Sequence, residues 1–225
     1  MLTNRSPLIG TLLILALSSC GETPDELLLE INQGEDTVRR YSIDQLGDFL
    51  SEREKSGAVF SKGELEAVEL LRDVAKSENE VIVNRMRAIS ALSQLEKTDN
   101  TAVFIDGLSS RYWGIRWEST KGLAIHPTPK AVGALISRLK VERERVVLLD
   151  TVKALSRAGG EDALEALFLV YFDESSLHFD NRMKAHAAIC RLTGKEFGLE
   201  NSHEWLKYYQ ERFTPGAGAA TGKKE

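Results

Sequence analysis

Seven consecutive residues, Arg111–Trp117, contain two tryptophans, one tyrosine and two arginines. These residue types are enriched at binding hot spots. Two interpretations are open. In the first, Tyr112, Trp113, Arg116 and Trp117 form a patch that binds a partner, since Trp113 and Trp117 are four residues apart and share one face of a helix. In the second, Trp113 fills a seam between structural repeats and Arg116 pairs with a carboxylate of the next repeat.

Residues suited to catalysis or metal binding occur without a recognised spacing. The four histidines are His126, His178, His186 and His203, and they form no zinc-ligand pattern. Carboxylates such as Glu142 and Glu144 lie at expected helix starts, where the helix dipole favours negative charge. We therefore predict no catalytic residue, no metal and no cofactor. An enzyme whose two carboxylates meet only in space stays open as an alternative.

The first nineteen residues have the layout of a secretory signal peptide. A weakly basic start containing Arg5 precedes an apolar run from Pro7 to Leu17, and small residues follow. The run is shorter than the roughly 20 apolar residues that a membrane span needs. We therefore expect residues 1–19 to be a cleaved leader.

The junction at which this leader ends, Leu17-Ser18-Ser19-Cys20, resembles the lipobox of bacterial lipoproteins. In that family the leader is cut before the cysteine, whose thiol and new amino group are acylated. The resemblance implies lipidation of Cys20 and anchoring to a bacterial envelope membrane, with the body in the periplasm or on the cell surface. Because Gly21 rather than Asp follows the cysteine, the resemblance favours the outer membrane. The alternative is an ordinary leader or a buried apolar segment with a chance cysteine.

The charge of the chain bears on whether it binds nucleic acid. The chain has 29 basic and 34 acidic residues, a net charge of −5, and no clustered basic stripe. Nucleic-acid phosphates need concentrated Lys and Arg, so we predict no nucleic-acid partner.

The second cysteine, Cys190, lies in an apolar helical context, and we expect it to be a buried, inert thiol without a disulfide partner.

The periodicity of the chain predicts short amphipathic helices from about residue 61 onward. Ser61 with Glu64, and Ser77 with Glu80, form the pattern of a capping box at a helix start. We therefore expect a helix to begin after each of these serines.

Upstream, the pattern predicts a different structure. The runs Leu27–Ile31 and Thr37–Tyr41 flank Gly34, which indicates a small β-hairpin. Ser42 with Gln45 forms another capping-box pattern, which we expect to open the first helix.

The helical region repeats. Four leucines recur at intervals of about 31 to 37 residues: Leu92, Leu123, Leu155 and Leu192. Four residues before each leucine stands a small residue: Ala88, Ser119, Thr151 and Ala188. A small residue at a fixed helical position lets a neighbouring helix approach closely, so the repeat predicts stacked helical hairpins.

Two segments, Arg85–Leu92 and Ile115–Leu123, resemble the second helices of short bacterial HEAT-like repeats. In that family an arginine near the helix start precedes small residues and a leucine. The third and fourth repeats of this chain have Leu148 and Ala185 in place of that arginine. The resemblance implies an all-α fold, a right-handed α-solenoid of about four HEAT-like helical hairpins.

The predicted organisation has five parts. They are a signal peptide (1–19), a lipidated tether with the hairpin and first helix (20–60), the solenoid (61–195), a C-terminal capping helix (196–213) and a disordered tail (214–225). The capping helix carries Trp205, Tyr208, Tyr209 and Phe213 on one face, which suits the exposed end of a solenoid.

Together these patterns favour a membrane-anchored, non-enzymatic scaffold that binds a protein or peptide partner in the cell envelope. Two alternatives stay open: an enzyme or enzyme accessory acting on an envelope substrate, and a purely structural envelope lipoprotein.

Overall fold

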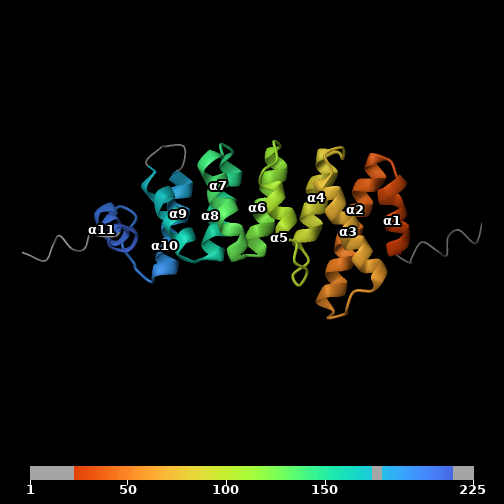
Figure 1. Cartoon of the computed structure of the whole chain (residues 1–225), viewed down its shortest axis with the longest axis horizontal. Helices are drawn as coiled ribbons and strands as arrows, with labels where there is room; N and C mark the ends of the chain where they lie inside the picture. Colours follow the sequence, from red (N-terminus) through yellow and green to blue (C-terminus); the bar gives the residue numbers. More distant parts are fainter. Residues whose placement is uncertain (1–22, 174–178, 215–225) are drawn as a thin grey trace, which may run out of the picture.

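The computed structural model describes residues 23–173 and 179–214. Within these ranges the chain forms helices and no strands, and the helices are paired in a row (Figure 1). The helices are α1 (Pro24–Gln33), α2 (Asp36–Lys55), α3 (Lys62–Lys76), α4 (Ile82–Ser93), α5 (Thr101–Gly107), α6 (Trp113–Ile125), α7 (Pro129–Val141), α8 (Arg145–Ala158), α9 (Glu161–Phe172), α10 (Phe179–Thr193) and α11 (Ser202–Phe213). The predicted leader, Cys20 and the tail from residue 215 lie outside the described residues.

The helices form two layers. The second helices of the pairs pack in sequence, α2 on α4, α4 on α6, α6 on α8 and α8 on α10, while the first helices α1, α3, α5, α7 and α9 lie beside them. Each pair contacts mainly the pairs before and after it. This arrangement confirms the predicted all-α solenoid of helical hairpins.

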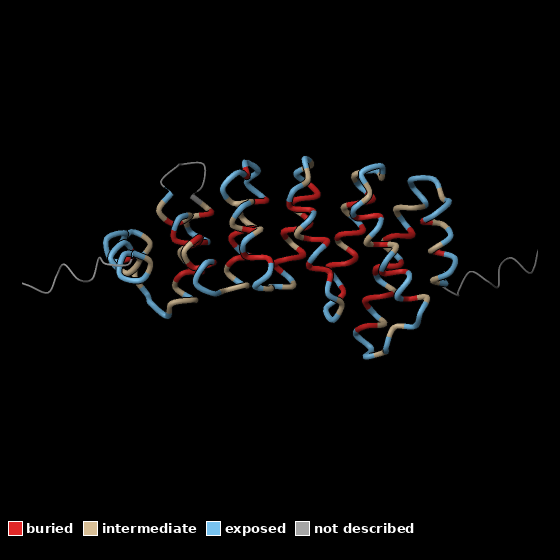
Figure 2. The backbone as a smooth tube through the Cα atoms, in the orientation of Figure 1, coloured by how far each residue is buried: buried red, intermediate tan, exposed pale blue. Residues whose placement is uncertain are grey.

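The repeated sequence positions form the core between the pairs. Three of the marker residues, Leu92, Leu123 and Leu155, are fully buried. The small residues that precede the four leucines are also buried: Ala88, Ser119, Thr151 and Ala188. Figure 2 shows the buried positions running through the row between neighbouring helices. Small side chains there let the second helices of adjacent repeats pack closely.

The predicted β-hairpin is wrong, because residues 24–55 form the helical pair α1 and α2. Thr23 and Glu26 make a reciprocal capping box at the start of α1. Leu27 and Ile31, one helical turn apart, are both buried. Gly34 caps the end of α1 and so joins two helices instead of two strands. The solenoid thus begins one pair earlier than residue 61.

Of the three predicted capping boxes, one is confirmed. The Ser61 hydroxyl accepts the backbone N–H of Glu64, whose carboxylate accepts the N–H of Ser61. The box at Ser42 is wrong because that residue lies inside α2. The box at Ser77 is also wrong, since Ser77 ends α3 and Glu80 accepts instead from its own next residue in the turn.

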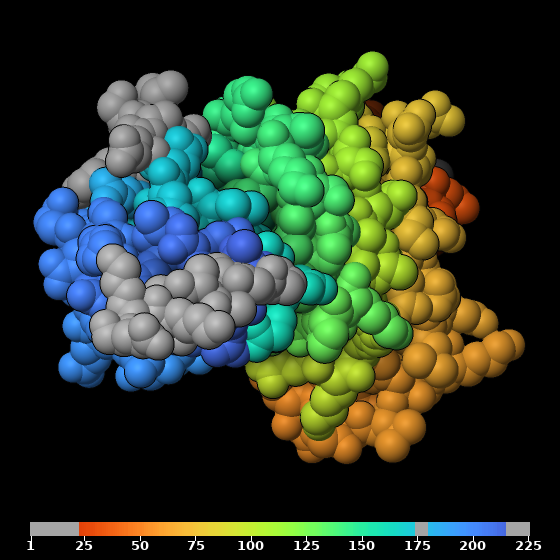
Figure 3. All heavy atoms as spheres, turned by 60° about the vertical axis from the view of Figure 1, so that its left-hand side comes forward, coloured from red at the N-terminus to blue at the C-terminus, as the bar shows by residue number. Residues whose placement is uncertain are grey.

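The C-terminal helix α11 lies against the last pair, and Figure 3 shows it at that end of the molecule. Its Trp205 is fully buried. The indole meets the rings of Phe168 and Phe197 edge-on, with centroids 5.8 and 4.9 Å away. Burying these rings covers apolar surface of α9 that would otherwise face water.

Candidate protein-binding surface

The aromatic cluster lies at the start of α6. Trp113 is the first residue of the helix and is 49% exposed. Trp117 lies one turn later and is partly buried, with its ring centroid 6.3 Å from that of Trp113. Trp113 therefore does not fill a seam between repeats, and that half of the second interpretation is wrong.

Arg116 points the other way, into the interface between the α5–α6 and α7–α8 pairs. Its Nε and Nη2 donate to the two carboxylate oxygens of Glu142 at 2.7 and 2.9 Å. Its Nη1 donates to the carbonyls of Ser110 and Arg111, both at 3.0 Å. Both members of the pair are buried. Arg116 thus pairs with a carboxylate of the next repeat and locks the α6 start against it.

The environment of Glu142 favours its charged form. Burial alone raises the pKa of a carboxyl group. Here the hydrogen bonds from Arg116 and from the backbone N–H groups of Arg143 and Glu144 outweigh burial and hold the pKa of Glu142 at about 2. The hydrogen bond between Arg116 and Glu142 also raises the pKa of Arg116 above its ordinary value. The pair is therefore fully ionised at neutral pH.

Trp117 is fixed by one contact with α8 and one within its own helix, α6. Its indole Nε1 donates to Oδ2 of Asp150 on α8 at 2.7 Å. One helical turn further along α6, Nζ of Lys121 lies 4.5 Å from the Trp117 ring centroid, a cation–π contact. The ring is thus presented in one orientation, and so it needs little ordering when a partner binds.

Tyr112 lies in the turn that precedes α6. It is the N-cap residue of the helix, with an extended backbone, and its hydroxyl accepts from Nη2 of Arg111 at 2.6 Å. The ring is half-buried. The structure therefore places Tyr112 beside Trp113, while Arg116 lies beneath them as support.

A row of apolar side chains extends this surface across four second helices. The row comprises Val83 on α4, Trp113 on α6, Val146 on α8 and Met183 on α10, each between 40 and 49% exposed. Three of them stand at one repeat position, nine residues before the marker leucine, and Trp113 is one residue earlier. Sequence reasoning missed this row, although the repeat register carries the signal. We call these four residues the apolar row.

Beside the row, α8 and α10 border a groove of about 780 Å³. Four cationic side chains line it: Lys153, Arg157, Lys184 and Arg191. The carboxylate of Asp150, which also lines the groove, is engaged by Trp117. The second-helix face therefore combines exposed apolar groups with positive charge on a chain of negative net charge.

Two of the histidines weighed for other chemistry, His126 and His186, have structural contacts, and His178 lies outside the described residues. Nε2 of His126 lies 2.7 Å from the Ser93 carbonyl, and Nε2 of His186 lies 2.8 Å from the Phe197 carbonyl. Burial raises the pKa of the Cys190 thiol, which disfavours the thiolate. The described ranges contain no cluster of three or more histidine, cysteine or acidic residues that could hold a metal ion. They also contain no helix with the length and apolarity of a membrane span.

Comparison with known proteins defines the class of fold. No protein-family model matches the sequence, and no curated protein is similar to it. The structure is similar to a chain from the complex of CpcE and CpcF of phycocyanin lyase from Nostoc sp. PCC7120, with a TM-score of 0.60 and 17% identity. The match covers 94% of this chain and 73% of that chain. The chain is thus a HEAT-like helical-repeat protein in its fold.

Proposed function

We propose that this chain is a non-enzymatic interaction scaffold whose partner protein docks on the second-helix face. The observation that carries the proposal is the apolar row together with the fixed indole of Trp117. The four side chains recur at nearly one repeat position on successive second helices, so one partner lying along that layer can contact all of them. Exposed apolar groups gathered on one face of a soluble domain mark interaction sites. Tryptophan is the residue type most enriched among binding hot spots.

The rigidity of the face supports the same role. Arg116 and Glu142 hold α6 against the next repeat, and Asp150 holds the Trp117 ring. A preorganised surface loses little conformational entropy on binding, so more of the contact energy appears as affinity. The structural neighbour comes from a complex of two different proteins, which is consistent with a repeat fold of this kind working with a partner.

We also propose that acylated Cys20 anchors the scaffold to a bacterial envelope membrane, with the outer membrane as the expected destination. The support is the lipobox-like segment that ends at Cys20. One thioether-linked lipid with a further acyl chain supplies the two hydrophobic signals that stable anchoring needs. Membrane fractionation of cells that express the wild type or Cys20→Ala tests this part by itself.

The docking proposal is tested by crosslinking in living cells, followed by affinity purification and mass spectrometry. Three forms are compared: wild type, Trp113→Ala, and Leu65→Ala as a control that removes an equally exposed apolar side chain from α3. We expect Trp113→Ala to weaken a specific partner complex at least tenfold, equivalent to about 1.4 kcal/mol. Leu65→Ala should recover the same complex as the wild type.

Stability measurements separate docking from folding. Because Trp113 is half exposed, its truncation should cost less than the roughly 3–5 kcal/mol of a core tryptophan. Equal recovery of partners by Trp113→Ala and the wild type would contradict docking on this face. Turnover of an envelope substrate that depends on one carboxylate or histidine would instead favour the alternative of an enzyme or enzyme accessory.

A further inference from the structure

Arg85 and Arg116 occupy the same repeat position, seven residues before Leu92 and Leu123, but their surroundings differ. Both side chains belong to buried residues, with exposures of 8% and 9%. Every nitrogen of the Arg116 guanidinium has a partner. Arg85 donates only from Nε, to the Ala75 carbonyl at 3.1 Å. In the described part of the chain its two terminal nitrogens have no hydrogen-bond or ion-pair partner.

The difference traces to one residue in the next repeat. Glu142, which pairs with Arg116, stands thirteen residues before Leu155, and the equivalent position before Leu123 is Ser110. The two residues make the same local contact. Glu142 accepts the backbone N–H two residues ahead at 3.0 Å, and the Ser110 hydroxyl does so at 3.2 Å. The serine side chain is too short to reach the guanidinium of Arg85. Arg85 therefore lacks the carboxylate partner that Glu142 provides to Arg116.

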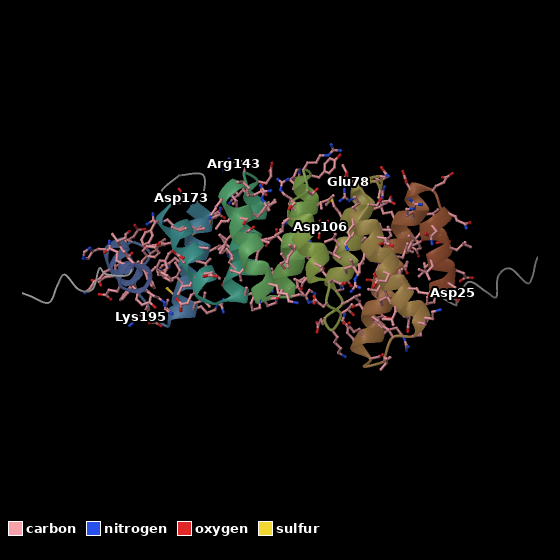
Figure 4. The ribbon with its side chains drawn as sticks, in the orientation of Figure 1. Asp25, Glu78, Asp106, Arg143, Asp173 and Lys195 are labelled. Carbon is pink, nitrogen blue, oxygen red and sulfur yellow. The ribbon has the colours of Figure 1, made fainter. Side chains whose placement is uncertain are left out.

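A polar pocket of about 480 Å³ lies where that carboxylate would be. Lys76, Arg85 and Arg111 contribute positive charge to its lining, and Ser110 forms part of the wall. Glu78 and Asp106 also line it, and Figure 4 labels these two on adjacent pairs of the row. Neither carboxylate forms an ion pair with Arg85. The three cations outnumber the two carboxylates by one positive charge, which a ligand with a single negative charge balances.

We infer that this pocket binds a carboxylate group of the partner protein, which pairs with the two terminal nitrogens of Arg85. Glu142 instead uses Nε and Nη2 of Arg116, because Nε of Arg85 is taken by the Ala75 carbonyl. Arg85 offers its terminal nitrogens in the fork geometry that suits a carboxylate. Tyr112 and Arg111 line the pocket and adjoin Trp113, so one partner can reach the pocket and the apolar row together. That the carboxylate comes from a partner protein rests on the proposed function, whereas the binding of a carboxylate by Arg85 does not.

The site itself is tested without a partner, using sodium acetate as the probe. The purified full chain is labelled with nitrogen-15, and the Nε–Hε resonances of Arg85 and Arg116 are followed by NMR at constant ionic strength. We expect the Arg85 resonance to shift in a saturable way. The Arg116 resonance should stay in place, because Glu142 already occupies its guanidinium.

Two matched variants examine the missing carboxylate. Ser110→Glu supplies it from within the chain, and Ser137→Glu adds the same charge to an exposed residue of α7 that does not line the pocket. We expect Ser110→Glu to abolish the acetate response of Arg85 and to raise Tm by roughly 2–4 °C, the shift that about 1 kcal/mol produces in a domain of this size. Ser137→Glu should leave the response unchanged.

Three results would overturn the inference. They are an Arg85 resonance that does not respond to acetate, an equal response in Ser110→Glu, and a response to inorganic phosphate at lower concentration than to acetate. Partner capture gives an independent measure, since Ser110→Glu should weaken a complex that Ser137→Glu retains. If Trp113→Ala has no effect on capture while acetate still binds Arg85, the docking face is refuted and the carboxylate site stands.

Discussion

Replacing Glu142 by Gln removes one charge from the buried pair with Arg116 and leaves the shape nearly unchanged. The cost follows from the pKa of Glu142, which is about 2 in the folded chain against an ordinary 4.5. Each pKa unit corresponds to about 1.4 kcal/mol, so the charged form stabilises the fold by about 3 kcal/mol. The general cost of breaking a buried ion pair, about 3–5 kcal/mol, agrees with this magnitude.

The pH dependence of this contribution has a defined sign. Since folding lowers the pKa of Glu142, the stabilisation is complete above the unfolded-state pKa and is lost as the pH falls through the folded-state pKa. Urea unfolding of the wild type and Glu142→Gln should therefore give a difference in the free energy of unfolding of about 3 kcal/mol at pH 7. That difference should fall to about half near pH 3.

Glu161→Gln is the matched control for this measurement. Glu161 also pairs with an arginine, Arg212, but its side chain is 61% exposed. An exposed ion pair contributes at most about 1 kcal/mol, so the control should unfold nearly as the wild type does. The reasoning is refuted if Glu142→Gln costs no more than the control, or if its cost is the same at pH 7 and pH 3.

Three further predictions use the same unfolding assay. Trp205→Ala should cost about 3–5 kcal/mol because the indole is fully buried in the α11 contact, and a cost below about 1 kcal/mol would contradict that burial. Gly122→Ala should cost about 1–3 kcal/mol, since its new Cβ would lie 2.9 Å from the ring of Phe104. Gly133→Ala, on an open face of α7, should instead stabilise by about 0.4–1 kcal/mol, and equal signs for the two alanines would refute the packing argument. Ser61→Ala should cost about 1 kcal/mol, because its hydroxyl accepts the backbone N–H of Glu64, and an unchanged stability would contradict that capping role.

The solenoid was predictable because its signal recurs. The pattern of a leucine with a small residue one turn earlier occurs at Leu92, Leu123 and Leu155, so each occurrence supports the others. A single helix or strand offers no such repetition. The first pair was missed because Leu27–Ile31 is a short apolar run, and such runs do not distinguish strand from helix by periodicity. The cap of Thr23 and Glu26 was the signal that could have decided it.

The binding face was only partly predictable for a different reason. The types and spacing of Trp113 and Trp117 suggested a patch, and the pairing of Arg116 with a carboxylate of the next repeat followed from chemistry. Which indole is exposed depends on how α6 packs against α4 and α8, and no local pattern encodes that packing. The partner of Trp117, Asp150, lies in the next repeat, so only the fold brings them together.

The nearest-neighbour arrangement of the helices also has a kinetic consequence. Every substantial helix–helix contact among the described elements joins helices one or two places apart in the chain. The contact order is therefore low, and chains of low contact order close only short loops on the way to the native state and fold quickly. A chain that emerges N-terminus first can complete each hairpin on the one already formed. Because α11 emerges after the other described helices, we expect the contacts of Trp205 with Phe168 and Phe197 to form after those of the earlier pairs.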